Sequence, residues 1–440
     1  MIPHSRFLKN LFFLMAPSAI FFHFEAFAGG FQLPVNSASG MGRAGSGEAA
    51  FGDDASVIAT NPAAMVMFED MQFVGALSLV FPSFDIFVEE ANIITTVDLS
   101  ITDFQTITVV TGKSSDDSGG ASLIPTFHLV YPHSSKVKFG FSVFSNFGFN
   151  SDYSDDFAGR FGGDASEILT FNFNPAISYK WSRKLSFGVG ANLIYGKLSY
   201  EQPIPDVLVL GGATLGTALA ILFPSVDVNA LLAGPPDGGK ALISADGIKV
   251  GVNMGLLYQY SKNTRIGFSY RPGVELTLKG NTVFENCSEA NVAIVSSLSS
   301  ICGSGFKTEI PFKLPGIFET SVYHRWRKKW AFHGDFMYTQ WKAFDKVTVL
   351  DVDRGETFFE AIENFKNSAR YSLGLTYKYS DKYTLRSGLA LDQTPVEASQ
   401  RNIQSNDSSR WVIAGGLRYQ YSKAVSFDFT HSRACFDTHS

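Results

Sequence analysis

The run Tyr371-Ser372-Leu373-Gly374-Leu375-Thr376-Tyr377-Lys378-Tyr379, which ends in the short turn Ser380-Asp381-Lys382, decides the fold class. Successive side chains of a β-strand point to opposite faces, so one face of this strand carries only Tyr and Leu. The other face carries Ser, Gly, Thr and Lys. An apolar face opposite a small polar face, with an aromatic residue at the strand end, is typical of a transmembrane barrel strand. We therefore predict an all-β, antiparallel transmembrane β-barrel.

The same arrangement recurs along the chain, where an aromatic-rich strand runs into a short polar turn and a second strand leaves it. Strands of about ten residues or longer flank these turns, which is the length that a tilted bilayer crossing requires. A soluble β-sandwich would also alternate, but its outer faces would be rich in Lys and Glu. Five further turns have this form: Tyr131–Lys136, Trp181–Lys184, Tyr260–Asn263, Trp326–Lys329 and Tyr421–Lys423.

Composition excludes several other classes of protein. The chain has 440 residues, of which 45% are hydrophobic and 18% are charged, so it is too apolar to be disordered. No internal run approaches the length of a membrane-spanning helix, which excludes a helical membrane protein. The formal net charge of −5 leaves no basic surplus for binding nucleic acid.

The first residues predict secretion. Arg6 and Lys9 precede an apolar stretch from Leu11 to Phe22, and Ala26-Phe27-Ala28 fits the small-x-small pattern of a signal-peptidase site. We expect residues 1–28 to be a cleaved signal peptide, with cleavage near Ala28-Gly29. An uncleaved anchor is the alternative, and the short apolar core argues against it.

The cysteines give one further expectation. Cys287 and Cys302 lie in the same connection between two strands, so a disulfide that closes this connection is possible in an oxidising compartment. Cys435 would then have no cysteine partner. The sequence contains no metal-binding Cys or His pattern, and we predict neither a metal site nor a cofactor.

Short motifs near the N-terminus carry a family resemblance. They are Gly30–Pro34, Ser39–Ala44, Gly47–Ala50, Asp53-Asp54 and Asn61–Met65. Further matching segments lie toward the other end of the chain, at Phe365-Lys366, Gly388–Asp392, Thr394–Val396 and Arg410-Trp411. In order and spacing the N-terminal motifs resemble the hatch of FadL-type outer-membrane transporters of long-chain fatty acids and other hydrophobic compounds (the OmpP1/FadL/TodX-like family).

This resemblance implies a monomeric, fourteen-stranded barrel in the cell outer membrane. It would have a hatch at residues 29–70 that plugs the lumen, and a barrel at residues 71–433. A long-chain fatty acid or other hydrophobic ligand would land in an apolar groove between extracellular loops and then enter an internal site. Movement of the hatch and a lateral opening of the wall would let it pass without ATP or proton coupling. Outer-membrane lipid and the barrel-assembly machinery are the other partners implied.

The resemblance also assigns residues to these parts. The hatch would act through Phe31, Arg43, Glu48, Asp53, Asp54, Asn61, Pro62 and Ala63. The lateral opening would lie at Asn146, Phe147, Gly148 and Phe149, although a simple β-bulge at Gly148 is an equal interpretation. The landing groove would use Leu208, Leu210, Leu219, Leu222, Phe223 and Leu231 in a long loop near residues 202–247, faced by a second loop near 281–307.

A fatty acid also needs a partner for its carboxylate. Lys197 aligns with a basic residue that the family uses near the ligand head group, and Lys346 and Arg354 are further candidates. Simple alternation, however, puts Lys197 on the same face as Leu193 and Tyr195. The other interpretation is a rim lysine whose ammonium group reaches the membrane interface. We expect Arg418, Lys378, Asp335 and His333 to face the lumen and to bond with hatch charges rather than with substrate.

Three other functions remain to be distinguished. Aromatic hydrocarbons are an alternative cargo for the same fold. A general diffusion porin shares the barrel physics, but it would have a polar constriction loop instead of an apolar one. We do not expect an enzyme, because an outer-membrane phospholipase would need Ser, His and a polar orienting group on one exposed face, and no strand shows such a set.

The number of strands departs from the family pattern. We count about thirteen, the first beginning at Met71 and the last ending at Arg433, and the tail 434–440 does not resemble a strand. A truncated or frameshifted reading frame is our hypothesis for the missing last strand.

Overall fold

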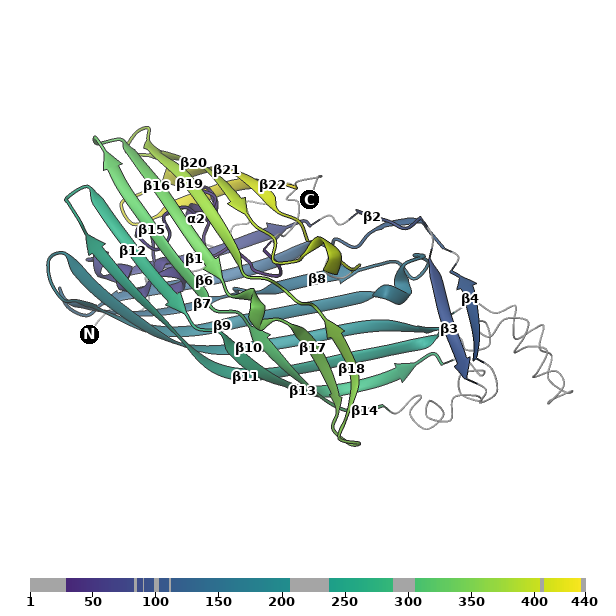
Figure 1. Cartoon of the computed structure of the whole chain (residues 1–440). Coiled ribbons are helices and arrows are strands. Elements are labelled where there is room, and N and C mark those ends of the chain that lie inside the picture. The colour runs from purple at the N-terminus through teal and green to yellow at the C-terminus, as the bar shows by residue number, and fades with distance from the viewer. Residues whose placement is uncertain are drawn as a thin grey trace, which may run out of the picture.

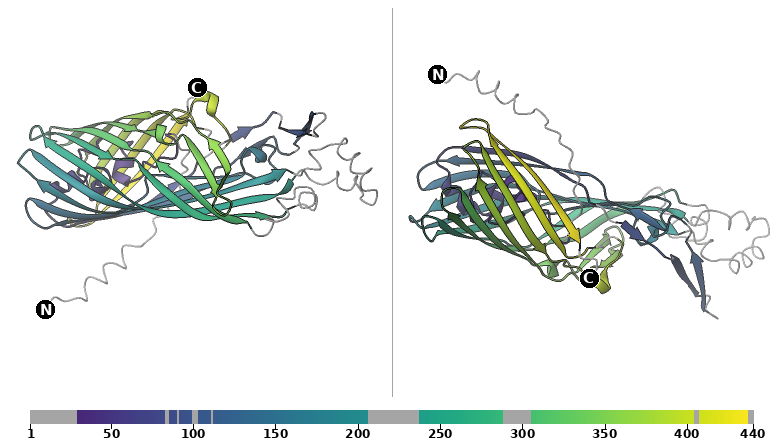
Figure 2. Two further views of the ribbon diagram at one scale, coloured as in Figure 1. Left: turned by 60° about the horizontal axis from the view of Figure 1, so that its bottom comes forward. Right: turned by 90° about the horizontal axis from the view of Figure 1, so that it is seen from above.

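The computed structural model describes residues 29–82, 85–89, 91–98, 103–110, 112–205, 237–287, 305–403 and 407–436. Strands dominate these residues, and an 18-stranded antiparallel sheet curves into a barrel (Figures 1 and 2). No helix among the described residues is long and apolar enough to cross a membrane.

Thirteen strands follow one another around the barrel wall, each in antiparallel register with the next. In order they are β1 (Gln72–Val80), β6 (Ser122–Pro132), β7 (Val137–Phe144), β9 (Ala165–Lys180), β10 (Leu185–Pro205), β11 (Asp237–Gln259), β12 (Thr264–Arg271), β15 (Ile317–Trp326), β16 (Trp330–Thr339), β19 (Ser368–Lys378), β20 (Tyr383–Asp392), β21 (Arg410–Gln420) and β22 (Ser426–Phe436). This agrees with the thirteen strands counted in the sequence.

Further strands extend the wall at the end opposite the six tight turns. They are β8 (Gly148–Asp152), β13 (Val274–Glu285), β14 (Phe306–Leu314), β17 (Lys346–Asp351) and β18 (Glu356–Ile362). Two separate ladders lie beyond β1, one formed by β2 (Asp85–Phe87) with β5 (Ser115–Asp117) and one by β3 (Asn92–Asp98) with β4 (Asp103–Val109). The sequence reasoning did not anticipate these two ladders.

Short helices complete the structure. The segment inside the barrel contains α2 (Ala38–Met41), α3 (Val57–Thr60) and the 3-10 helix η2 (Pro62–Met67). The connections between strands contain η3 (Arg160–Gly162), η4 (Trp341–Ala343) and η5 (Ala398–Gln400).

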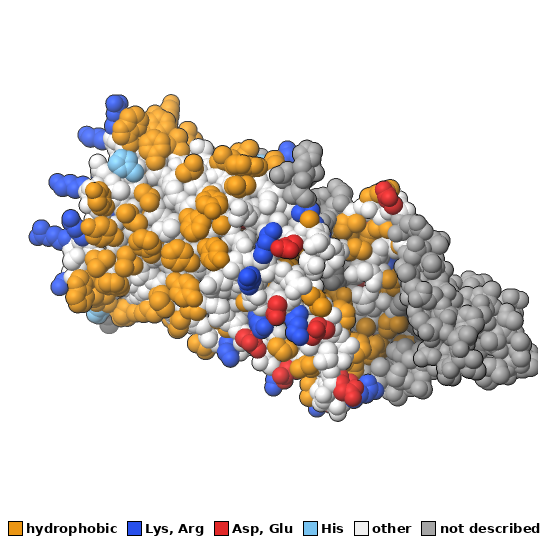
Figure 3. All heavy atoms as spheres, viewed as in Figure 1, with side chains coloured by type: hydrophobic (Ala, Val, Ile, Leu, Met, Phe, Trp, Pro, Cys, Tyr) orange, Lys and Arg blue, Asp and Glu red, His pale blue; other side chains and the backbone are white. Residues whose placement is uncertain are grey.

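The two faces of the wall differ as the alternation predicts. In β19, Leu373 is 69% exposed whereas Ser372 is buried against the lumen contents. On the face shown in Figure 3, apolar side chains are spread over the barrel wall, and Lys and Arg gather beyond them at the tight-turn end. Tyr379, Trp181 and Tyr421 are exposed at this end, as aromatic residues at a membrane interface should be.

Several expected boundaries differ in the structure. β10 and β11 pair as far as Pro205 and Asp237, so the first long loop is shorter than residues 202–247. β13 and β14 likewise shorten the second loop. β22 continues to Phe436, because Ala434 pairs with Val412 and is buried; the expectation that the strand ends at Arg433 was wrong.

Candidate functional site

The N-terminal segment, residues 29–70, lies inside the barrel and is called the hatch below (Figure 1). η2 packs against β9, β10 and β11, and α2 packs against β21 and β22 on another part of the wall. Glycines in the wall let the hatch backbone approach closely. A Cβ atom at Gly267 would lie 1.9 Å from the carbonyl oxygen of Ala49, and one at Gly388 would lie 2.1 Å from the carbonyl carbon of Arg43.

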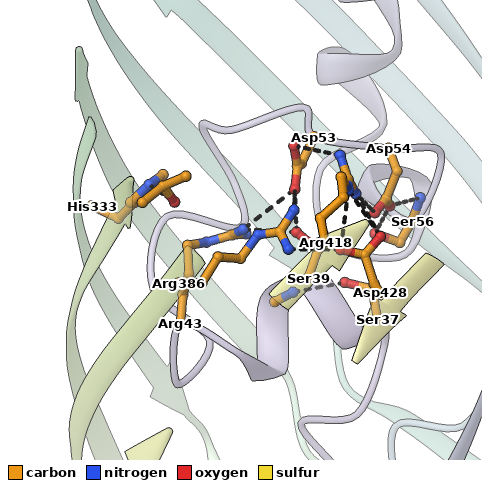
Figure 4. A network of polar contacts seen from close by, with 12 residues as sticks. Ser37, Ser39, Arg43, Asp53, Asp54, Ser56, His333, Arg386, Arg418 and Asp428 are labelled. Carbon is orange, nitrogen blue, oxygen red and sulfur yellow. Dashed lines mark hydrogen bonds and ion pairs between the residues drawn. The ribbon is translucent and has the colours of Figure 1, made fainter. Parts of the chain in front are cut away.

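Ion pairs join the hatch to β20, β21 and β22 (Figure 4). Asp53 accepts hydrogen bonds from Arg386 Nη2 at 2.6 Å and from Arg418 Nη1 at 3.0 Å. Both arginines also donate to Asp428 of β22, and Arg418 lies 3.4 Å from Asp54. The expected contact of Arg418 with the hatch is therefore present, whereas Arg386 and Asp428 were not anticipated.

The hatch arginine completes this network. Arg43 Nη1 lies 3.7 Å from Asp53 and donates to Ser39 Oγ at 2.7 Å, and its guanidinium stacks over the ring of Phe51. Burial by itself would raise the pKa of Asp53, but Arg418, Arg386 and Arg43 together hold that pKa below its ordinary value. Asp53 therefore remains a carboxylate that ties hatch and wall together.

Asn61 fixes the start of η2. Its side chain accepts a hydrogen bond from Ala63 N at 3.0 Å, and Pro62 occupies the first position of the helix, where no N–H group is required. Its Nδ2 donates to Ala49 O at 2.6 Å and to Leu256 O of β11 at 3.1 Å. The Asn-Pro-Ala motif thus joins two turns of the hatch to the wall.

Glu48 lies in the same cavity as two acidic side chains of the wall. Within the described residues, no cationic group lies at hydrogen-bond distance from its carboxyl group. Glu48, Glu319, Asp335 and Arg370 line one polar cavity between hatch and wall. Burial raises the pKa of Glu48 to about 8, and the neighbouring Glu319 carboxyl adds to the rise. Asp335 accepts a hydrogen bond from Ser321 of the wall, and among the described residues it has no hydrogen bond or ion pair with the hatch, unlike the expectation from the sequence.

His333 and Lys378, the other two residues predicted to bond with hatch charges, have different partners in the structure. His333 Nε2 lies 2.9 Å from Thr376 Oγ1, and the His333 ring packs against Phe51 of the hatch. Lys378 pairs instead with Asp381 in the adjacent turn at 2.8 Å, so the expectation that it contacts the hatch was wrong. Lys378 is the last residue of β19, and its side chain is 53% exposed.

The wall is interrupted between β7 and β8. β7 pairs with β9 up to Phe144, and β8 resumes this pairing at Gly148, so residues 145–147 leave the ladder. β6 pairs with β7 only from Phe127 to Pro132, and within the described residues its 122–126 half has no register with β8. The interruption thus lies beside a stretch of wall where two neighbouring strands are not joined.

The start of the hatch occupies this interruption. Leu33 N donates to Asn146 O at 2.7 Å, and Gly148 N donates to Phe31 O at 2.9 Å. Leu33 also packs with Val35 against Ile124 of β6. Backbone groups that lost their strand partners are therefore satisfied by the hatch.

An apolar cavity lies beyond the hatch, in the outer half of the barrel. Phe31 lines it and packs against Trp341, Phe344 and Phe147, with ring centroids 4.7, 5.0 and 5.7 Å away. The other apolar lining residues are Phe149, Ile168, Leu198, Tyr200, Ile243, Phe344, Val347, Val349, Phe359, Ala361, Phe365, Val396 and Ile403. Such a cavity suits the hydrocarbon part of a ligand.

None of the predicted head-group residues lines this cavity. Lys197 pairs with Glu167 at 2.7 Å, Lys346 with Glu360 at 2.8 Å, and Arg354 with Asp351 at 3.4 Å. The neighbouring Leu198 does line the cavity, so Lys197 points to the opposite face of β10, as simple alternation indicated.

Other expectations fall outside the described residues. The predicted landing-groove residues, Leu208 to Leu231, all lie there, and so does Cys302. Cys287 is disulfide-bonded, whereas Cys435 is free. Within the described residues, no group of three or more His, Cys, Asp and Glu side chains could hold a metal ion.

The structure also forms a Ser-His contact that the sequence reasoning missed. His128 Nδ1 of β6 lies within hydrogen-bond distance of Ser142 Oγ of β7, and its Nε2 lies 3.0 Å from Asn36 O of the hatch. Both side chains are fully buried beneath the hatch. His128 and Ser142 are opposite each other in the register of β6 and β7, and this register could not be read from the sequence.

The fold and the site define a class of protein: an outer-membrane β-barrel that encloses its own N-terminal segment and an apolar cavity beyond it. The chain belongs to the family described as outer membrane protein transport protein (OMPP1/FadL/TodX), whose model matches residues 20–440. The protein is accordingly located in the outer membrane.

Characterised relatives and solved structures agree with this assignment. The chain is 31% identical over 414 residues to the long-chain fatty acid transport protein of Escherichia coli O157:H7, covering 92% of this chain and 87% of the relative. It is 29% identical to outer membrane protein P1 of Haemophilus influenzae, covering 92% and 85%.

Two solved structures share the fold. A FadL homologue from Pseudomonas aeruginosa matches with a TM-score of 0.74 and 20% identity, covering 93% of this chain and 91% of that chain. The toluene transporter TbuX from Ralstonia pickettii matches with a TM-score of 0.59 and 18% identity, covering 93% and 94%.

Proposed function

We propose that this protein carries hydrophobic molecules passively across the outer membrane. The observation that carries the proposal is the apolar cavity, which Phe31 of the hatch lines directly beside the interrupted wall. A hydrocarbon chain in this cavity gains free energy by leaving water, at roughly 25 cal/mol per Å² of buried apolar surface.

The path follows from the same contacts. A ligand in the cavity touches Phe31, so withdrawal of Phe31 would open a way toward the gap between β6 and β8. In the described part of the chain, two backbone hydrogen bonds, at Asn146 and Gly148, hold the start of the hatch in this gap, together with the packing of Leu33 against Ile124. We assign the lateral exit to this gap, lined by Asn146, Phe147, Gly148 and Phe149, and we propose that the protein acts as a monomer.

Uptake by cells that lack their own transporter tests this path. Gly148→Val should reduce uptake of both oleate and toluene about tenfold, because a Cβ atom there would lie 2.8 Å from Leu33 Cδ1 and larger branches would fill the gap. Gly415→Val is the matched control, since nothing lies within 4 Å of a Cβ atom at Gly415. Normal uptake by the Gly148 variant would remove the lateral exit from the proposal.

The head-group role predicted for Lys197 is tested in the same assay. Lys197→Ala should leave oleate uptake within about twofold of wild type, because Lys197 pairs with Glu167 at a partly exposed position and does not line the cavity. A selective loss of oleate uptake would return Lys197 to the head-group role.

A general diffusion porin is disfavoured by the hatch, whose ion pairs and wall contacts occupy the lumen. A porin needs a continuous water-filled path.

A further inference from the structure

The polar groups of the apolar cavity are acidic. Glu363 and Asp407 are the charged residues among the lining, and no Lys, Arg or His of the described residues joins them. Ser118, Ser151, Ser166 and Ser199 supply the neutral polar contacts. A buried carboxylate ligand would therefore face two carboxyl groups, and no cation of the described lining would offset its lost hydration.

Cations close to the cavity are already engaged by other carboxylates. Arg410 donates to Asp392 at 2.9 Å, and Arg370 lies 3.9 Å from the same carboxylate. Lys197, Lys346 and Arg354 pair on other faces, as described above. Arg401, in the same loop as Asp407, is not among the lining residues. A ligand anion would have to compete for these cations or go without one.

One carboxylate oxygen of Asp407 lacks a hydrogen-bond donor in the described structure. The residue is 7% exposed and lies in the connection between β20 and β21. Its Oδ2 accepts hydrogen bonds from Gly30 N at 3.0 Å and from Thr394 Oγ1 at 2.7 Å. Its Oδ1 is buried and accepts no hydrogen bond within the described structure. A buried acceptor without a donor is costly, and a ligand donor would remove that cost.

The protonation of Asp407 is compatible with this role. Burial raises the pKa of Asp407 to about 6, so at neutral pH the group is mainly a carboxylate and accepts hydrogen bonds. An O–H group bound to a carboxylate makes a charge-assisted hydrogen bond, which is stronger than a neutral one.

We propose that the cavity selects uncharged hydrophobic molecules that carry a hydrogen-bond donor, such as long-chain alcohols, over fatty-acid anions. The hydroxyl group of the ligand donates to Asp407 Oδ1, and its hydrocarbon chain lies against the ring of Phe31 and the valines of β17. This inference rests on the proposed transport of hydrophobic molecules and names the ligand class that the same cavity takes.

Equilibrium binding to the full chain in lipid nanodiscs tests the proposal, with empty nanodiscs as the background. Three ligands of equal chain length separate the effects: 1-dodecanol, dodecanoate and dodecane, all at pH 8. We expect 1-dodecanol to bind at least tenfold more tightly than dodecanoate to the wild-type protein. Equal or tighter binding of dodecanoate would overturn the proposal.

Two variants locate the interaction. Asp407→Leu should weaken 1-dodecanol binding about tenfold and leave dodecane binding unchanged. Thr394→Val removes a hydrogen bond to the other oxygen of Asp407 and should keep 1-dodecanol binding within about twofold, which controls for disturbance of the loop. If both variants behave alike, the selective role of Asp407 Oδ1 is wrong.

A gain-of-function variant tests whether the absence of a cation from the lining causes the preference for uncharged ligands. Ser166→Lys introduces a cation into the lining, and it should reverse the preference toward dodecanoate. An unchanged preference would show that charge in the cavity does not set selectivity.

Failure of the two proposals can be told apart. If wild-type protein binds none of the three ligands and supports no oleate or toluene uptake, the transport function itself is wrong. If uptake and dodecane binding persist without a preference for 1-dodecanol, only the selectivity is wrong.

Discussion

At the scale of single residues, the hatch is held by a few charges whose partners lie far away in the chain. Asp53 receives three guanidinium groups, from Arg43, Arg386 and Arg418. Removing one partner from a buried ion pair costs about 3–5 kcal/mol, because the remaining charges lose their compensation. This makes Asp53 the residue on which hatch docking depends most directly.

Asp53→Asn should loosen the hatch while the barrel stays folded. A loss of about 3 kcal/mol corresponds to roughly a hundredfold rise in hydrogen exchange of hatch amides. Asp381→Asn, which removes the partner of Lys378 in an exposed turn, should leave hatch exchange unchanged. Hatch protection that survives Asp53→Asn would contradict the role of this network.

Glu48 should make hatch docking sensitive to pH. Its pKa in the docked state is raised to about 8 from an ordinary value of 4.5, so the docked state favours the protonated form. Stability from this group is complete below about pH 4.5 and is lost as the pH rises toward 8.

Exchange of hatch amides, corrected for intrinsic rates, should therefore accelerate between pH 5 and 8. Glu48→Gln should flatten this dependence, because a glutamine side chain has no proton to lose in this pH range. An identical slope in the variant would assign the titration to another group.

At the scale of elements, β12 and β20 fit the hatch because they lack side chains where its backbone passes. The close approaches at Gly267 and Gly388 involve backbone atoms of the hatch, which cannot move aside as a flexible side chain can. Overpacking of this kind costs about 1–3 kcal/mol.

Gly388→Val should displace the hatch without unfolding β20. We expect proteolysis of the hatch to become at least tenfold faster, with the heat resistance of the barrel retained. Nothing lies within 4 Å of a Cβ atom at Gly415 on the next strand. Gly415→Val should therefore match the wild-type protein in both respects. Equal proteolysis of both variants would mean that close wall contact does not hold the hatch.

At the scale of the whole molecule, the hatch should distinguish this protein from an open pore, because it occupies the lumen. In planar bilayers the wild-type protein should give no steady ohmic current, because the hatch contacts the wall on several sides. Arg386→Gln combined with Arg418→Gln leaves Asp53 with Arg43 as its one remaining ion-pair partner within the described residues. This double variant should show frequent openings.

Steady conductance in the wild-type protein would restore the porin interpretation, and a closed double variant would show that other contacts suffice to hold the hatch. The exposed pair Lys346 and Glu360 offers a matched control, because charge removal there should not change the current.

The sequence predicted the barrel well and the site only in part. Alternation identified the apolar face of β19 and the thirteen strands, since each pattern is local to its own strand. It identified Arg418 as facing the lumen, but Arg386 and Asp428 obey the same alternation and were overlooked. Lys378 was misplaced, because alternation gives the face of a residue and not its depth along the barrel.

What the sequence by itself determined is the membrane barrel, its tight-turn rim and the family motifs of the hatch, since periodicity and turn chemistry reside in neighbouring residues. Only the tertiary structure decided which charges meet. Asp407 and Gly30, or Asp53 and Arg418, are separated by hundreds of residues and are brought together by strand register. The acidic lining of the cavity and the gap beside β8 depend on that register, because burial and pairing arise only when the strands of the wall are assembled.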